Sequence, residues 1–155
     1  LSIAQQFPEL AQSVSQQLAT ELDRVASELA FERERQIALR SYLVPKVKRG
    51  IVGTSRYAVR LRQDIKKASS DRGSVLIFGE PGLEKDNTGA LIHFGSRDRK
   101  EPLIKVNCNT LQPVELFGRS DKPGLLDWVG RGTLMLNNLE DISPEFEEKL
   151  VQLLT

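Results

Sequence analysis

The stretch that most constrains the fold is SVLIFGEPGLEKD, residues 74–86. It opens with an apolar run of strand type, Val75–Phe78. A turn rich in glycine and proline follows, and then Lys85 before a segment that can be helical. Strand, glycine loop and lysine at a helix start are the parts of a phosphate-binding loop, in which backbone N–H groups and the helix N-terminus face an anion. This order predicts an α/β fold with the loop between a strand and a helix.

The loop departs from the working pattern G-x-x-x-x-G-K-[ST] at its second glycine. Aligning Gly79 and Lys85 with the pattern places Glu84 at that position. Glycine there lets the backbone wrap a phosphate closely, whereas a glutamate adds bulk and a negative charge that faces the ligand. We therefore expect phosphate binding to be impaired, with Lys85 either still touching a phosphate or left as an exposed remnant.

Composition sets the outer limits. The 155 residues are about one domain's length, and a hydrophobic content of 39% supports a core but not a membrane span. A net charge of +1 gives no electrostatic case for nucleic-acid binding. Cys108 and His93 are the only residues of their kinds, which excludes an internal disulfide and multi-histidine metal sites. We expect both to be structural and the protein to be cytoplasmic. Because Leu1 is not methionine, we expect a piece of a longer protein.

Residues 2–42 predict one long helix, because Pro8 is tolerated in a first turn and no Gly or Pro follows before Pro45. Leu18, Leu22, Val25 and Leu29 step by four, three and four, which is the seam of a coiled coil. Charged residues interrupt the seam further along. The alternative is an amphipathic helix packed on its own domain. We expect residues 1–45 to be a helical linker and homo-oligomer contact (through residues 8–43), and residues 46–155 to be the compact domain.

The rest of the sequence alternates strand and helix patterns. Helices are predicted from a Ser55 cap to about residue 68, over 86–94 and 113–117, and from a Ser143 cap to about 154. Strands are predicted over 74–78, 103–107 and 133–137, and residues 125–130 are ambiguous. Strands separated by helices predict an α/β domain with a mostly parallel sheet.

Six motifs occur in a fixed order beyond residue 50. They are IVGTS (51–55), SVLIFGEPGLEK (74–85), ALIH (90–93), IKVNCNTL (104–111), ELFG (115–118) and GLLDWVGRGTLML (124–136). This order resembles the AAA+ central domain of bacterial sigma-54-dependent transcription activators. The resemblance implies a P-loop NTPase (AAA+) parallel sheet with flanking helices, here incomplete and preceded by one long helix. Separately, FPELAQSVSQQLATEL (7–22) is similar to the helix near the end of cyclic-nucleotide-binding regulator domains.

The departures from that family bear on function. Its Asp-Glu pair after the apolar strand, which holds Mg²⁺ and polarises the attacking water, is here Asn137-Asn138. Neutral amides supply neither the charge that a hard cation needs nor a general base. The family's sigma-54-contacting loop should lie between Phe117 and Gly124, where only GRSDKP stands. In the family's sheet, a third strand lies between the strand before the glycine loop and the strand before the Asp-Glu pair. In sequence order that third strand would come after Thr155. We therefore expect either a cut domain or a reduced sheet of about three strands.

The candidate nucleotide-binding residues are those of the altered loop and the two amides. They are Gly79, Glu80, Pro81, Gly82, Leu83, Glu84, Lys85, Asp86, Asn137 and Asn138. We expect no catalytic residue and no metal ligand among them, so that ATP is a doubtful ligand and Mg²⁺ is not expected.

Three functions follow from the resemblance and these departures. The first is a degenerate module that does not hydrolyse ATP and serves regulation or assembly, with another protein domain or a transcription component as partner. The second is an ATP-binding switch without hydrolysis. The third is an active ATPase driving sigma-54 transcription initiation. No direct contact with nucleic acid or membrane is expected from this part.

Overall fold

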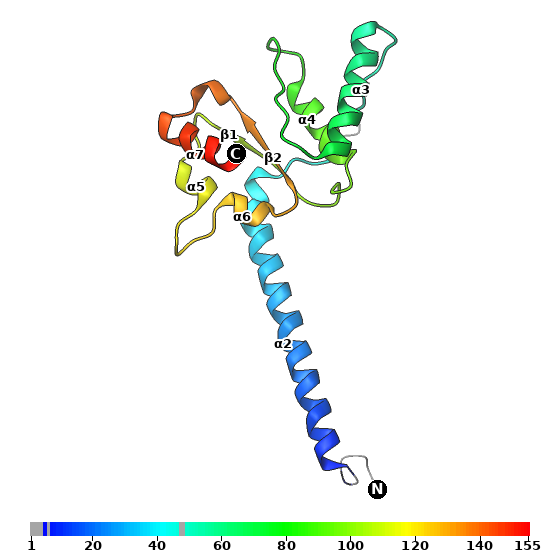
Figure 1. Ribbon diagram of the computed structural model, residues 1–155, viewed down its shortest axis with the longest axis vertical. Coiled ribbons are helices and arrows are strands. Elements are labelled where there is room, and N and C mark those ends of the chain that lie inside the picture. Colours follow the sequence, from blue (N-terminus) through cyan, green and yellow to red (C-terminus); the bar gives the residue numbers. More distant parts are fainter. Residues whose placement is uncertain (1–4, 6, 47–48) are drawn as a thin grey trace. The chain divides into compact units, whose positions relative to one another are not determined.

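The structure of the protein, a computed structural model, describes residues 5, 7–46 and 49–155. The chain forms two compact units that divide between Ala38 and Leu39 (Figure 1). The predicted start of the long helix, at residues 2–4, lies outside the described residues. None of the helices in the described ranges is long and apolar enough to cross a membrane.

Helix α2, Pro8–Leu39, confirms the long helix, and its residues up to Ala38 belong to the first unit. A 3-10 turn, η1 (Arg40–Tyr42), follows it. The leucines of the predicted seam are exposed, with 60% of Leu18, 70% of Leu22 and 66% of Leu29 accessible. Intrahelical ion pairs, such as that between Arg24 and Glu28 at 2.7 Å, line the polar side of the helix. An exposed row of this kind is an unsatisfied apolar stripe.

The sheet of the second unit has two parallel strands, β1 (Leu103–Asn107) and β2 (Thr133–Asn137). Leu103 pairs with Thr133 and Asn107 with Asn137. Leu43 forms an antiparallel bridge with Ile104 at the outer edge of β1, and Val44 N–H donates to Leu103 O at 2.9 Å. The outer edge of β2 carries no further strand within the described residues.

The strand predicted over residues 74–78 is wrong. The segment is not part of the sheet, and its backbone makes no hydrogen bond to another described backbone group. Leu76 is 72% exposed and Phe78 is 86% exposed. An apolar run becomes a strand only when a neighbouring strand completes its backbone ladder. The sheet therefore has two strands instead of about three.

One face of the sheet, through Ile104 and Val106, packs on the hydrophobic core. Three helices and the end of α2 close this core: α5 (Pro113–Phe117), α6 (Leu125–Val129) and α7 (Pro144–Leu154). Its buried members are Leu39, Ile104, Val106, Leu111, Leu116, Leu125, Val129, Phe146 and Leu150. The ambiguous stretch 125–130 is thus a short helix, with both of its apolar ends in the core.

The opposite sheet face is covered by α4 (Lys85–Phe94), against which α3 (Arg56–Asp71) packs. A Cβ atom on Gly89 would lie 3.0 Å from Met135 Sδ, so the glycine allows α4 to approach β2 closely. The predicted Ser55 cap of α3 is confirmed, since its hydroxyl accepts from Ala58 N–H at 3.1 Å. The predicted Ser143 cap of α7 is also confirmed, by a bond from Phe146 N–H at 3.2 Å. A short turn, η2 (Leu139–Asp141), joins β2 to α7.

Candidate functional site

The glycine loop connects the exposed segment 74–78 to α4. Gly82 has φ of +92° and Glu84, at the N-cap of α4, has φ of +52°. Both are left-handed conformations, which glycine adopts freely and other residues avoid. The backbone thus keeps a glycine-like geometry at the position where the sequence carries glutamate. Glu80, Pro81 and Leu83 lie on the exposed turn.

Lys85 and Glu84 of the loop both have partners within the protein. Lys85 Nζ donates to Gly79 O at 2.9 Å, so the lysine folds back over its own loop. A Glu84 carboxylate oxygen lies 3.0 Å from an Arg49 guanidinium nitrogen, with both side chains exposed. The bond to Gly79 O uses one of the three N–H donors of Lys85, and Glu84 adds a negative charge to the loop that a phosphate would approach.

The structure brings the end of the loop to the end of β2, as the sequence predicts for a nucleotide site. Asn137 Nδ2 donates to Asp86 Oδ1 at 2.9 Å. Asn138, with φ of +55°, turns away from this contact, and its Nδ2 donates instead to Asn107 Oδ1 at 2.8 Å. Asn137 therefore joins the loop, while Asn138 joins the two strand ends.

Sequence reasoning missed Lys105, which lies in the middle of β1. Its Nζ donates to Asp86 Oδ2 at 3.0 Å. A signal was present, because a lysine inside the otherwise apolar LIKVN strand must point away from the core. The strand register was needed to place it, since it pairs Lys105 with Met135, two residues before Asn137.

The charge on Asp86 is stabilised by these neighbours. Burial of the carboxyl raises its pKa, but the hydrogen bonds from Lys105 and Asn137 and the charges of Lys105 and Lys85 together hold the pKa below its usual value. Asp86 stands at the Ser/Thr position of the phosphate-loop pattern. A fixed carboxylate therefore occupies a position where the pattern requires a neutral hydroxyl.

The residues present do not fit a magnesium site. Mg²⁺ prefers about six oxygen ligands in octahedral geometry and retains several waters. At this site the single carboxylate has one oxygen engaged by an ammonium and the other by an amide N–H. No group of three or more His, Cys, Asp or Glu side chains that could hold a metal occurs in the described part of the chain.

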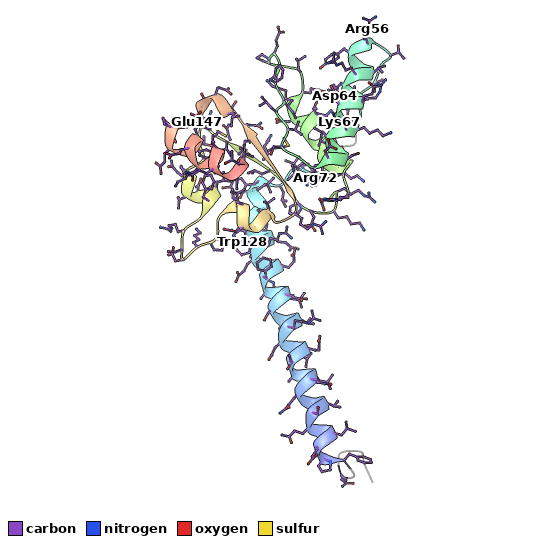
Figure 2. The ribbon with its side chains drawn as sticks, in the orientation of Figure 1. Arg56, Asp64, Lys67, Arg72, Trp128 and Glu147 are labelled. Atoms are coloured by element: carbon purple, nitrogen blue, oxygen red, sulfur yellow. The ribbon has the colours of Figure 1, made fainter. Side chains whose placement is uncertain are left out.

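A second polar cluster, also missed by sequence reasoning, lies at the opposite end of α4. Arg72, the C-cap of α3 (Figure 2), donates from Nε to Asp98 Oδ2 at 3.1 Å and from Nη1 to Thr133 Oγ1 at 3.1 Å. His93 is fully buried and lies 2.7 Å from Thr133 Oγ1 through Nδ1. Arg131 adds a further bond to Asp98 at 3.0 Å. The cluster joins α3, α4 and the start of β2, so His93 has a structural role, as predicted.

The remaining candidates also have structural roles. Cys108 is buried, and burial, with the charges of Glu140 and Asp141, raises its thiol pKa, so the thiolate nucleophile is disfavoured. Trp128 packs against the core of the second unit. A hollow lined by Asp64, Lys67 and Asp71 of α3 and by residues 73–75 includes no residue of the glycine loop or of the Asn137 contact.

The segment where a sigma-54-contacting loop was expected, between Phe117 and Gly124, is a tight turn. Arg119 N–H donates to Lys122 O at 2.8 Å, and Lys122 N–H donates back to Arg119 O at 3.2 Å. Gly118 and Gly124 approach so closely that a Cβ atom on either would collide with the backbone of the other. The turn is therefore short and closed at its base.

Comparisons with known proteins agree on one family. The model of the sigma-54 interaction domain matches residues 51–155. The Nif-specific regulatory protein of Rhodobacter capsulatus is 36% identical over 118 residues, covering 68% of this chain and 20% of that protein. The transcriptional regulator VasH of Vibrio cholerae is 32% identical over 134 residues, covering 78% of this chain and 25% of that protein. The chain thus spans a quarter or less of the length of these two relatives.

Solved structures give the same result. A crystal structure of NtrX from Brucella abortus in complex with ATP superimposes with a TM-score of 0.61 at 27% identity, covering 88% of this chain and 29% of that one. The corresponding complex with ADP gives a TM-score of 0.59 at 28% identity. The P-loop NTPase (AAA+) fold predicted from the sequence is confirmed.

Proposed function

The chain belongs to the sigma-54 interaction domain family, and we propose that it is a degenerate member that regulates or assembles a transcription or signalling protein without hydrolysing ATP. Residues 46–155 supply the domain, and the helix at 8–43 links it to a second copy. Its working partners are another protein domain or a transcription component.

The observation that carries this proposal is the contact between Asp86 and Asn137. At the end of β2, where hydrolysis needs an acidic metal ligand and a neighbouring general base, an amide donates to the loop carboxylate at 2.9 Å. Asn138, at the position of the base, is hydrogen-bonded to Asn107. Neither amide can take a proton from water near neutral pH.

The loop supports the same proposal. Glu84 brings a carboxylate to the face that would meet a triphosphate, and Lys85 is held by Gly79 O. The closed turn between Gly118 and Gly124 argues further against the sigma-54 contact that the resemblance implies for that segment. Assembly and regulation are functions that need none of these groups.

A second candidate function is an ATP-binding switch without hydrolysis. It is favoured by the left-handed backbone at Gly82 and Glu84, which keeps a glycine-like turn before Lys85. The similar NtrX has been crystallised with ATP and with ADP. An ATPase that drives transcription initiation is the least supported of the three functions, because it requires the acids that Asn137 and Asn138 replace.

Titration with fluorescently labelled ATP separates the first two functions. If the domain is a regulatory module that binds no nucleotide, neither the wild type nor Lys85→Ala should show saturable ATP binding at micromolar protein. Micromolar binding that disappears in Lys85→Ala would overturn that function and establish the switch. Lys100→Ala, at an exposed position in the loop after α4, is the matched control for loss of one positive charge.

Assembly through α2 has its own test. We expect wild-type protein to sediment as an oligomer, because exposed leucines in heptad spacing bury their side chains by pairing. Leu22→Lys places a charge in the seam and should give monomers, whereas Gln17→Lys, on the outer side of the helix, should leave the oligomer intact. A monomeric wild type would contradict the coiled coil.

A further inference from the structure

Lys105 and Asn137 both contact the Asp86 carboxylate, and the three residues are here called the Asp86 cluster. The carboxylate comes from the first turn of α4 and the other two side chains come from the neighbouring strands β1 and β2. Lys105 Nζ lies 3.0 Å from Asp86 Oδ2, and Asn137 Nδ2 lies 2.9 Å from Asp86 Oδ1. Both carboxylate oxygens are therefore engaged by N–H donors of this chain.

The position of this cluster follows from the register. Lys105 lies opposite Met135, and Met135 contacts the α4 glycine, Gly89. Because side chains alternate along a strand, Lys105, Met135 and Asn137 share the sheet face that α4 covers. Lys105 is thus directed to the end of the glycine loop by the sheet itself and not by a flexible surface loop.

The charges in the cluster are those of a filled cation site. Asp86 is at the last position of the phosphate-loop pattern, and Asn137 is the first residue after the apolar run of β2. The lysine ammonium supplies the positive charge and three N–H donors, and the carboxylate balances it. A divalent cation placed here would meet the ammonium at short range and would find a single carboxylate whose two oxygens are already engaged.

We propose that the Lys105 ammonium, which lies 3.0 Å from Asp86 Oδ2, is a built-in cation that takes the place of a divalent metal beside the Asp86 carboxylate. The site therefore has no use for Mg²⁺, and any phosphate compound that reaches the loop is bound without a metal. This statement concerns the cation alone, so it holds whether the domain is a module without nucleotide or an ATP-binding switch.

The direct test is Mn²⁺ binding to the full chain, followed by the loss of the free Mn²⁺ electron paramagnetic resonance signal. The wild type should bind weakly. The double variant Lys105→Met, Asn137→Asp removes the ammonium and adds a second carboxylate, and its affinity should rise by about tenfold or more. If the double variant binds Mn²⁺ no more tightly than the wild type, the proposal is overturned.

Two further variants keep this test decisive. Lys105 and Asp86 are about half exposed, so the single variant Lys105→Met should fold and should gain Mn²⁺ affinity in the same direction. Lys100→Met removes an exposed lysine elsewhere and should gain nothing. If Lys100→Met gains as much as Lys105→Met, the effect comes from overall charge and the proposal fails.

A second measurement distinguishes this proposal from the proposed function. Labelled ATP is titrated into the wild type with excess EDTA and again with excess Mg²⁺. If Lys105 replaces the metal, the ATP titration curve should be the same in EDTA and in Mg²⁺, whether the protein binds ATP or not. An affinity about tenfold higher with Mg²⁺ would overturn it. Binding that is equal in both media would instead support the built-in cation and the switch against the module without nucleotide.

Discussion

At the scale of single residues, Glu84 combines a local conflict with a functional consequence. Its φ of +52° is a left-handed conformation, and its side chain makes no cap hydrogen bond at the start of α4. A non-glycine residue in this conformation costs roughly 1–2 kcal/mol. The exposed ion pair with Arg49 returns about 0–1 kcal/mol. The contacts of the Glu84 side chain therefore do not offset the cost of its left-handed backbone.

Substitutions at this position separate the backbone cost from the charge. Both Glu84→Gly and Glu84→Ala lose the ion pair with Arg49. Glu84→Gly relieves the left-handed strain but raises the conformational entropy of the unfolded chain, whereas Glu84→Ala keeps the strain. We expect Glu84→Gly to be more stable than Glu84→Ala by about 1 kcal/mol, measured by urea unfolding. Equal stabilities would show that Glu84 is unstrained.

His93 illustrates a residue whose protonation state is fixed by its neighbours. Glu101 O can only accept, so the Nε2 of His93, 2.9 Å away, donates. Nδ1 then accepts from Thr133 Oγ1–H at 2.7 Å, and that hydroxyl oxygen accepts from Arg72 Nη1 at 3.1 Å. The imidazole is neutral in this relay. Burial, assisted by the Arg72 charge, lowers its pKa, despite the opposing effect of the bond to Glu101 O.

The sign of the pH effect follows. The unfolded chain, with a histidine pKa of about 6.5, binds the proton before the folded chain does, so stability is complete above that pH and falls as the pH drops through the lowered pKa. We expect the free energy of unfolding to be smaller at about pH 5 than at about pH 7, with a smaller difference in His93→Gln. A wild type equally stable at both pH values would contradict the neutral relay.

At the scale of elements, residues 74–78 differ from every other predicted segment. They have strand composition, but they make no backbone ladder and expose Leu76 and Phe78. The parallel strands β1 and β2 share five paired positions and cover each other's backbone groups along one edge. Residues 74–78 therefore have the composition of a strand without belonging to the sheet.

Hydrogen exchange measured by mass spectrometry tests this difference. Amides of residues 74–78 should exchange within seconds to minutes, because no backbone acceptor in the described residues protects them. Paired amides of β1 should be slower by about tenfold or more. Equal protection of the two segments would show that 74–78 is paired in solution.

The same segment shows what the sequence could and could not predict. The bounds of β1 and β2 and the caps Ser55 and Ser143 came out as predicted, because local side-chain patterns determine them. Whether an apolar run becomes a strand depends on pairing with a strand distant in sequence, which a local pattern does not show. The predicted strand at 74–78 is wrong for this reason. Lys105 was missed for a related reason, since only the register of β1 against β2 directs its ammonium to Asp86.

At the scale of the whole molecule, the chain consists of a helix with an exposed apolar seam and a small α/β unit with a two-stranded sheet. The unit retains the order of motifs of its family, and Gly82 and Glu84 of its glycine loop have positive φ. The polar side chains of its site contact one another or the backbone: Lys85 donates to Gly79 O, Lys105 to Asp86, and Asn138 to Asn107. These contacts and the exposed seam are the basis for proposing regulation by assembly.

The most direct test of this account is phosphate release from ATP with Mg²⁺, measured at protein concentrations high enough to favour oligomers. We expect the rate of the wild type to equal that of Lys85→Ala and of buffer alone, because Asn137 and Asn138 supply neither the acidic metal ligand nor the general base that the family's hydrolysis uses. Turnover in the wild type that is lost in Lys85→Ala would contradict the central claim.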